Sequence, residues 1–462
     1  LDALTTENDN TAIGYSALSS EVSGFRNTAV GSGAGANQNG GTNNALLGYN
    51  AGSDITTGDA NTFIGSDCGD ANTTASNNTG VGQNALGANT TGSENIAIGV
   101  NALQGNTTGS FNVAMGFNAM STSSAGPIRN VAIGYASMQS ITNAGYNTGV
   151  GMYSLNAVTT GANNTAIGYE AMANNTTGAD NNAYGSGALD ACTTGGDNNA
   201  FGRGSLGAIT TGGANCAFGH GAVDAVVSGS GNTGMGQNVL TNCTGSNNTA
   251  VGYQAGFSTT SPAQNVFMGY QAGYDNTTGQ YNTCIGPNQA GNNLTTGGFN
   301  IYMGYLSAAS AGDVGGELVL ATGNSTNTGK GDNTGFIVAS NGVYQGNNSS
   351  SWSTTSDRRI KKNIEDNTTG LDAINQIRVR NFEYRTEDEI TEVPTHAAIN
   401  KEGVQLGVIA QEIETILPDV VREESTGVKT VNPDNLTWYL VNAVQELSTQ
   451  VDELKQELKT LK

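Results

Sequence analysis

Residues 164–168 read Asn-Thr-Ala-Ile-Gly, and the next Asn-x-x-x-Gly unit begins seventeen residues later at Asn181. Eighteen such units follow one another, and their spacing departs from seventeen only by single residues. A fixed period of this length indicates a solenoid, in which one unit stacks on copies of itself. We therefore expect a mostly β rod over residues 1–305 and not a pocket enzyme. The asparagines are Asn10, Asn27, Asn44, Asn61, Asn78, Asn95, Asn112, Asn130, Asn147, Asn164, Asn181, Asn198, Asn215, Asn232, Asn248, Asn265, Asn282 and Asn300.

The pattern inside one coil predicts its local structure when the asparagine is counted as position 0. Position 3 is a large apolar residue in nearly every coil, as at Ile167, and position 2 is usually small. We expect two short strands joined by a bend at the glycine, with one large apolar residue of each strand pointing inward. Thr-Thr-Gly, as at residues 210–212, predicts the turn that closes the coil. Stacked asparagine amides should form a hydrogen-bonded ladder, and the glycine permits positive φ or close backbone approach.

Composition and charge exclude several classes of function. The chain has 462 residues, 67 of them Gly, with 12% charged residues and a net charge of −21. Residues 1–355 hold four basic side chains, Arg26, Arg129, Arg203 and Lys330, so we expect no nucleic-acid partner. No apolar run is long enough to span a membrane. The chain begins at Leu1, and we expect a missing upstream segment that contacts other fibre or baseplate proteins.

The five cysteines, Cys68, Cys192, Cys216, Cys243 and Cys284, show no metal-ligand spacing such as C-x-x-C. We interpret them as small buried hydrophobic residues, and we expect no metal and no cofactor. Tyrosines often follow the glycine column, as at Tyr135 and Tyr253. They form either an aromatic stripe for glycan or surface contact or a packing surface within or between chains.

The repeat ends near residue 305, and residues 306–355 are expected to form a β neck and linker. Segments 315–321 and 335–339 are apolar enough to be strands, and Asn341-Gly342 is a hairpin-type turn. Beyond Ser356 the composition changes, because thirteen of the seventeen Lys and Arg residues lie there. We therefore expect a separate small α+β domain over residues 356–462.

Four features of this last domain can be interpreted. Residues 370–377 predict a short amphipathic helix, 380–384 a strand, and 407–421 a strand and helix ended by a proline. The tail, about residues 436–462, predicts a coiled coil because its apolar residues alternate steps of four and three. We expect Asp434, next to Pro433, to be the N-cap of this helix. The seam residues are Leu440, Val444, Leu447, Val451, Leu454, Leu458 and Leu461.

Two resemblances extend this interpretation. The Asn-x-Ala-x-Gly repeats of residues 10–310 are similar to the head repeats of trimeric autotransporter adhesins, which form a trimeric β-roll. Residues 356–462 resemble the endosialidase chaperone or S74 peptidase family of phage tail spikes and fibres. That resemblance is carried by Ser-Asp-Arg-Arg-x-Lys at 356–361, Gly-x-Ile-Ala-Gln-Glu at 407–412, Pro-Asp-Val-Val at 418–421 and the heptad tail.

The second resemblance implies a specific chemistry. Members of that family assemble β-rich fibres as trimers, and many then cut themselves off with a Ser–Lys dyad. The dyad would fall on Ser356 and Lys361, with cleavage of the bond that precedes Ser356. A neutral lysine is needed as general base, so its ammonium must be partly desolvated. The family includes uncleaved members, so retention and cleavage of the chaperone both stay open.

From these observations we expect a homotrimeric extracellular fibre that carries its own folding chaperone. The first interpretation is a viral tail fibre or spike that attaches to a host-surface or glycan receptor, located on the virion tail. The alternative is a bacterial surface adhesin or appendage subunit, located on the cell surface. An enzyme that cuts polysaccharide is disfavoured, because no pair of acidic residues is placed for that reaction.

Overall fold

The chain folds as two compact units, Leu1–Ser353 and Thr354–Lys462, and each is described by itself. The computed structural model describes residues 9–123, 126–261, 263–322, 326–338, 343–345, 358, 361–392, 402–423 and 428–461. The predicted fold class is confirmed, since the first unit is a β-solenoid and the second a small α+β unit that ends in a long helix. We refer to residues 1–305 as the shaft.

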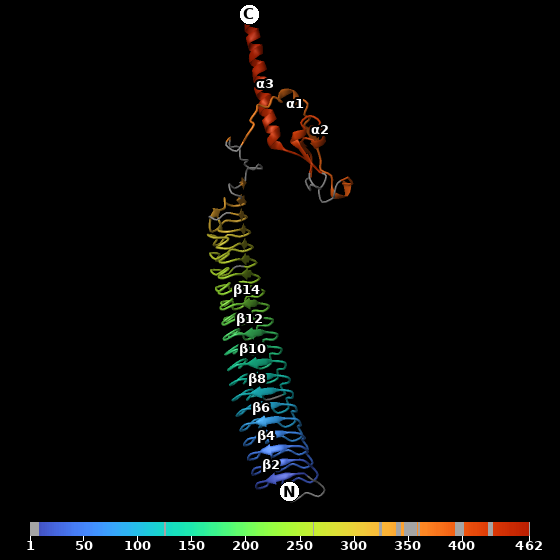
Figure 1. The fold of residues 1–462 in the computed structure, drawn as a ribbon, viewed down its shortest axis with the longest axis vertical. Helices are drawn as coiled ribbons and strands as arrows, with labels where there is room; N and C mark the ends of the chain where they lie inside the picture. Colours follow the sequence, from blue (N-terminus) through green and yellow to red (C-terminus); the bar gives the residue numbers. More distant parts are fainter. Residues whose placement is uncertain are drawn as a thin grey trace. The chain divides into compact units, whose positions relative to one another are not determined.

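Each of the eighteen coils contributes one three-residue strand, and consecutive strands pair in parallel with identical register, as in Thr165↔Asn182 and Ala166↔Ala183 (Figure 1). The expectation of two strands per coil is therefore wrong. The strands are β1 (Thr11–Ile13), β2 (Thr28–Val30), β3 (Ala45–Leu47), β4 (Thr62–Ile64), β5 (Thr79–Val81), β6 (Ile96–Ile98), β7 (Val113–Met115), β8 (Val131–Ile133), β9 (Thr148–Val150), β10 (Thr165–Ile167), β11 (Asn182–Tyr184), β12 (Asn199–Phe201), β13 (Cys216–Phe218), β14 (Thr233–Met235), β15 (Thr249–Val251), β16 (Val266–Met268), β17 (Thr283–Ile285) and β18 (Ile301–Met303).

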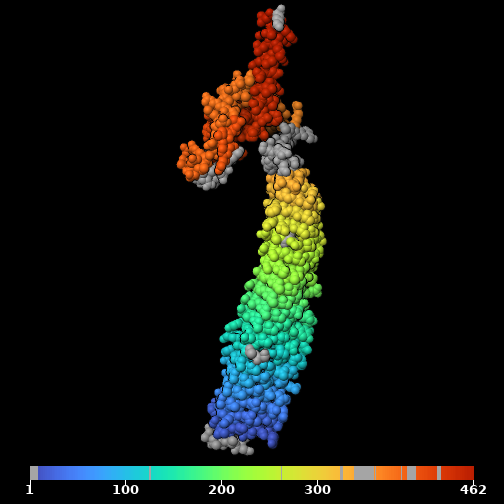
Figure 2. Space-filling view, turned by 180° about the vertical axis from the view of Figure 1, so that it is seen from behind, coloured from blue at the N-terminus to red at the C-terminus, as the bar shows by residue number. Residues whose placement is uncertain are grey.

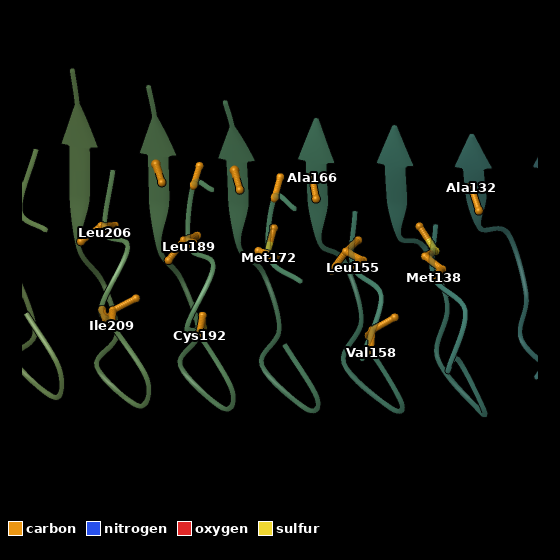
Figure 3. Packing of buried hydrophobic residues seen from close by; sticks show 14 of the residues in the cluster. Ala132, Met138, Leu155, Val158, Ala166, Met172, Leu189, Cys192, Leu206 and Ile209 are labelled. Carbon is orange, nitrogen blue, oxygen red and sulfur yellow. The ribbon is translucent and has the colours of Figure 1, made fainter. Parts of the chain in front are cut away.

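The side chain that points into the coil is the middle residue of each strand. Ala166 is fully buried, whereas Ile167, predicted to point inward, is exposed. Successive side chains of a strand point to opposite faces, so only one of these two neighbours can enter the core. The small residue enters because positions 7 and 8, such as Ala171 and Met172, already fill the narrow interior. Figure 3 shows Ala166 and Met172 in this core.

The second half of the coil is built from turns instead of a strand. Position 8 is buried but has a left-handed backbone, with φ 49° at Leu155 and 50° at Met172. Such angles are uncommon for non-glycine residues, and stacking maintains them here: the N–H of Met172 donates to the carbonyl of Ala188 at 2.9 Å. The Thr-Thr-Gly turn stacks in the same way, because the Thr159 hydroxyl donates to the Thr176 carbonyl at 3.0 Å.

The predicted asparagine ladder is present, and its side chains are buried from Asn27 to Asn300. The Oδ1 of Asn147 accepts the backbone N–H of Asn164 at 2.9 Å and its Nδ2 at 3.1 Å. The Nδ2 of Asn164 also donates to the carbonyl of Gly178, 2.8 Å away in the same coil. Each asparagine therefore joins its own coil to the one before it without placing a charge in the core.

The glycine column allows the coils to approach closely, as predicted. Gly168 has φ +141°, and a Cβ atom there would lie 2.6 Å from the carbonyl oxygen of Gly185 in the next coil. A side chain at this position would therefore force the coils apart. Figure 2 shows that each part of this unit contacts only its sequence neighbours, as expected for a solenoid.

The sheet continues past the last asparagine of the ladder. β18 pairs in parallel with β20 (Leu318–Ala321), β20 with β22 (Gly335–Val338), and β22 pairs antiparallel with β23 (Val343–Gln345). A small parallel pair, β19 (Ser307–Ala308) and β21 (Asn327–Thr328), lies beside them. Glu317 follows Asn300 by seventeen residues and donates its N–H to the Asn300 Oδ1 at 2.7 Å, so it ends the ladder. The predicted Asn341-Gly342 turn lies outside the described residues.

The second unit has a small hydrophobic core that its short strands and helices surround. Its elements are α1 (Leu371–Ile374), β24 (Arg380–Phe382), η2 (Glu387–Glu389), β25 (Gln405–Gly407), α2 (Ala410–Glu414), η4 (Pro418–Val420), β26 (Val421–Glu423), β27 (Lys429–Val431) and α3 (Pro433–Thr460). β24 pairs antiparallel with β25, and β26 with β27. Ile413, Leu417 and Val420 form the buried centre.

The long tail helix is confirmed, but its predicted N-cap is wrong. The Oδ1 of Asn432 accepts the backbone N–H groups of Asp434 and Asn435 at 3.0 and 3.4 Å, and Pro433 occupies the first turn. A proline is favoured at the first helical position, so the residue before it is the cap. Asp434 lies inside the first turn, where its charge suits the helix dipole.

Candidate functional site

The outward face of the shaft sheet carries a continuous column of large apolar side chains at position 3. All eighteen are apolar or aromatic, and none is buried; Ile13 is 61% exposed and Ile98 is 37% exposed. The column contains Ile13, Val30, Leu47, Ile64, Val81, Ile98, Met115, Ile133, Val150, Ile167, Tyr184, Phe201, Phe218, Met235, Val251, Met268, Ile285 and Met303. We call it the outward column.

Position 1, the other outward residue of each strand, contributes no charge to this face. It is Thr, Val, Ile, Ala, Asn or Cys in all eighteen strands. Eighteen strands at ~4.8 Å spacing make a strip roughly 80 Å long. Monomeric soluble proteins rarely expose a contiguous apolar patch of this extent, so the strip marks an interaction surface.

Aromatic side chains on the shaft stack on one another along its axis. Tyr184, Phe201 and Phe218 form a triad on β11, β12 and β13, with ring centroids 4.7 and 4.5 Å apart and interplanar angles of 6° and 3°. The position-5 residues Tyr253 and Tyr270 stack in the same way at 5.6 Å. Rings stacked along the axis cover each other's faces and present edges outward, which favours packing over face-on binding of sugar rings.

The cysteines differ in burial, and burial controls their reactivity. Desolvation raises the pKa of the Cys68 thiol to about 12 and that of Cys192 to about 11. Thiolates are the reactive form, so these buried thiols are inert. Cys216 is different, because it is half-buried at position 1 of β13 on the outward face. All five cysteines are unpaired, and the described residues hold no cluster of His, Cys, Asp and Glu suited to a metal ion.

The expected dyad is only partly within the described residues. Ser356 lies outside them, so its distance to Lys361 remains untested. Lys361 is exposed, and its backbone N–H donates to the carbonyl of Arg358 at 3.2 Å. The dyad therefore stays a prediction that rests on the resemblance.

Sequence reasoning missed a clamp between the segment that follows Lys361 and helix α3. The Glu446 Oε2 accepts the backbone N–H of Leu371 at 2.8 Å, and the Asn442 Nδ2 donates to the carbonyls of Asn367 and Thr369 at 2.9 and 3.1 Å. Polar residues outside the heptad seam of a predicted coiled coil were the only available signal. The clamp places one face of α3 against its own unit.

The seam face of the same helix is uncovered in the single chain. Val444 is exposed, as are the other six predicted seam residues. Each would lie at an a or d position of a heptad, where apolar side chains need a facing helix. Among the described helices, none is long and apolar enough to cross a bilayer.

Ion pairs hold helix α2 in place and explain one of the motifs that carry the resemblance. Glu412, the last residue of Gly-x-Ile-Ala-Gln-Glu, accepts two hydrogen bonds from Arg380 at 2.8 and 3.2 Å. The Arg380 guanidinium lowers the pKa of the Glu412 carboxyl below its usual value. On the other side of α2, Lys429 pairs with Glu414 at 2.6 Å, and this contact raises the pKa of the lysine. These pairs connect β24 and β27 to α2.

The comparison with known families confirms the resemblance of the second unit. The family model for the chaperone of endosialidase, peptidase S74, matches residues 356–422. The match begins at Ser356 and ends before α3, so it covers the opening segment and the small core.

Three curated relatives are similar to parts of the chain. A probable tail fiber protein of Escherichia phage Phieco32 is 32% identical over 30% of this chain and 19% of its own length. The long tail fiber protein Gp37 of Salmonella phage S16 is 32% identical over 23% of this chain and 14% of its own. A myelin gene regulatory factor-like A of Dictyostelium discoideum is 30% identical over 27% of this chain and 13% of its own. The chain spans less than a fifth of each relative, and no solved structure matches it.

Proposed function

We propose that this chain is the shaft and chaperone portion of a viral tail fibre, which assembles as a homotrimer and serves host attachment. The observation that carries the proposal is the outward column, which is apolar in all eighteen coils and uncovered in the single chain. Two of the three relatives bear tail fibre names, which favours the virion tail over a bacterial cell-surface appendage.

In this proposal the three shafts pack with their sheet faces toward a common axis. The outward column and the uncharged position-1 residues then form the apolar centre of the interface. Closed cyclic symmetry places identical coils at the same height, which suits identical apolar residues meeting level by level. The coil core itself is already filled within one chain, as Ala166 and Met172 show, so assembly covers the outer face and not the interior.

The chaperone role follows from the physics of pairing repeats. Parallel β stacking of non-local segments is slow, and nearly identical coils specify register weakly. A coiled coil of α3 helices that forms first would hold three shafts side by side and shorten that search. The exposed seam at residues 440–461 supports this role.

The native cysteine pattern provides the test. Light scattering on the full chain should give the mass of a trimer, and electron microscopy should show a rod. A short bis-maleimide that is present while the chains assemble, when Cys216 is still half-exposed, should join chains through Cys216 on the proposed interface. The cysteines buried within one chain should stay unmodified. A Cys216→Ser variant should assemble normally and lose the cross-link. A monomer, or a trimer in which Cys216 reacts as an isolated surface thiol, contradicts this packing.

We also propose single-turnover self-cleavage by Ser356 and Lys361. The Ser356 hydroxyl attacks the carbonyl carbon of Thr355 and Lys361 accepts the hydroxyl proton. Lys361 then gives this proton to the Ser356 nitrogen, the peptide bond breaks, and an ester between Thr355 and the Ser356 side chain remains. Water then hydrolyses the resulting ester. Lys361 is exposed in the described part of one chain, so the desolvation that a neutral lysine needs would come from assembly or from residues outside the described ranges.

Intact mass spectrometry tests this second proposal separately. Protein purified from its source should contain a fragment that ends at Thr355 and one that begins at Ser356. Ser356→Ala should give only the full-length chain, and Lys362→Ala, a neighbouring lysine, should still cleave. A wild-type chain that stays intact in the assembled fibre would identify this protein as one that retains its chaperone.

A further inference from the structure

The aromatic triad of β11–β13 lies between two charged edges of opposite sign. At position −1, one residue before the ladder asparagine, Asp180 and Asp197 are exposed. At position 5, just after the glycine, Arg203 and His220 are exposed, with the Arg203 Nη2 2.9 Å from the His220 Nε2. Positions −1 and 5 flank the strand on opposite sides, so the acidic and basic edges border the same stretch of the sheet face.

Asp197 and Arg203 cannot pair within one chain. They belong to the same coil, and strand β12 (Asn199–Phe201) runs between them. Six residues of near-extended chain separate their backbones by up to ~20 Å. Within the described part of the shaft, Arg203 makes no ion pair with a carboxylate, and its nearest polar partner is the imidazole of His220. Both side chains are exposed, and among the described residues neither takes part in an ion pair within the chain.

A parallel cyclic assembly brings these two edges together. When sheet faces meet around an axis parallel to the shaft, the position-5 edge of one chain faces the position −1 edge of the next. We propose that Arg203 pairs with Asp197 of a second copy of this chain, and that this pair and the aromatic triad fix the axial register of the three shafts. The inference rests on the proposed packing through sheet faces.

The rest of the outward face could not fix the register. The outward column is otherwise Ile, Val, Leu and Met, so a slip of one coil still packs apolar residues against apolar residues. The aromatic side chains of the column occur only at Tyr184, Phe201 and Phe218, and Arg203 is the only basic residue besides His220 at position 5. An apolar centre with a charged rim is also the usual anatomy of a specific interface.

Asp180 lies one coil from Asp197 and could also pair with Arg203, but closed symmetry still makes the in-register trimer the most favourable one. A slip in one direction would place Arg203 opposite Asp180, which is also favourable. In a closed trimer the slips around the ring must cancel, so at least one interface shifts in the other direction. There Arg203 would face Ala214 or Gly231, which carry no charge. Only the in-register trimer makes all three pairs.

Charge reversal on the full chain tests the inference. Arg203→Asp should reduce the Cys216 cross-linked species by about ten-fold or more, because like charges then meet at every interface. Combining Arg203→Asp with Asp197→Arg should restore the cross-link, since the pair is reformed with its signs exchanged. Arg26→Asp is the matched control: it reverses another shaft charge at position −1, where the facing residue is Ser32.

The outcomes separate this inference from the packing on which it rests. If the wild type cross-links through Cys216 but the double variant does no better than Arg203→Asp alone, the register pair is wrong and the packing stands. The same holds if Arg203→Asp cross-links like the wild type. If the wild type is not a trimer, or does not cross-link, the proposed packing fails and this inference fails with it.

Discussion

The shaft and the C-terminal unit are stabilised by opposite kinds of contact. In the shaft the same neutral hydrogen bond recurs at every coil, as between Asn147 and Asn164. In the C-terminal unit each contact occurs once and several are charged, as between Arg380 and Glu412. Repetition makes the shaft stable and long, but identical coils carry little information about alignment. In the proposed trimer the unique unit brings three chains side by side, and Arg203 and Asp197 then set the register of the shafts, so a repetitive fibre would need a separate folding domain.

The largest effect is expected from removing the unit that aligns the chains. A chain truncated at Asn435 loses most of α3 and its exposed seam. We expect loss of all soluble trimer, because three separate shafts then have to meet by diffusion before any register pair can form, while non-local parallel pairing is slow. Size-exclusion chromatography with light scattering measures this directly. A soluble trimer from the truncated chain would show that the shaft aligns itself and that α3 has another role.

The next largest effect is expected on the outward face of the shaft. Ile167→Asp places one carboxylate per chain in the proposed apolar centre, where burying an unpaired charge is strongly unfavourable. We expect the trimer to dissociate or fail to form. Thr177→Asp is the control, since Thr177 lies in the Thr-Thr-Gly turn of the same coil and its side chain is exposed. Equal behaviour of the two variants in light scattering would mean that the outward column faces solvent.

The period, the asparagine ladder and the glycine column could all be predicted from the sequence, because each is a strict one-letter pattern with one physical explanation. The sequence alone could not predict that the side chain of Ile167 points out of the coil. A large apolar residue at a fixed position indicates burial, but the sequence does not tell a core within the chain from an interface between chains. The single observation that separates them is geometric: Ala166 points inward in a three-residue strand, so Ile167 has to point outward.

The candidate site shows the same limit. Ser356 and Lys361 were identified from a resemblance, and their geometry is not tested by the described residues. The N-cap at Asn432 could have been predicted from the proline that follows it. The sequence analysis placed the cap at Asp434 instead. No sequence pattern singles out Arg203 and Asp197 as partners. They become candidates only when their positions in the coil place them on opposite edges of the strand. Pairing between chains depends on symmetry, and one chain's sequence does not state its symmetry.

A smaller effect is expected from one rung of the ladder. Asn164→Ala leaves the backbone N–H of Asn181 and the carbonyl of Gly178 without their buried partner. We expect a loss of about 3 kcal/mol in the free energy of unfolding, or the corresponding rise in unfolding rate where the fibre unfolds irreversibly. Asn174→Ala, which removes an exposed amide from the same coil, should cost less than about 1 kcal/mol. Similar losses for both would show that the ladder contributes no more than surface hydrogen bonds.

The smallest effect separates the two regions by pH. Pairing with Arg380 lowers the pKa of Glu412 in the folded unit, so its stabilising effect is complete above the carboxyl's unfolded pKa of about 4.3 and is lost as pH falls through the lower folded value. Acidification below pH 4 should therefore destabilise the C-terminal unit. Glu412→Gln should weaken this pH dependence. The ladder amides of the shaft do not titrate, so the stability that they give the shaft should not change with pH. Fluorescence of Trp438 in a Trp352→Phe variant follows the C-terminal unit alone, because Trp352 belongs to the first unit and the chain has no other tryptophan. Circular dichroism of the β-rich shaft is the internal control. If fluorescence and dichroism change together on acidification, both regions depend on carboxylates and the contrast between neutral and charged contacts is wrong.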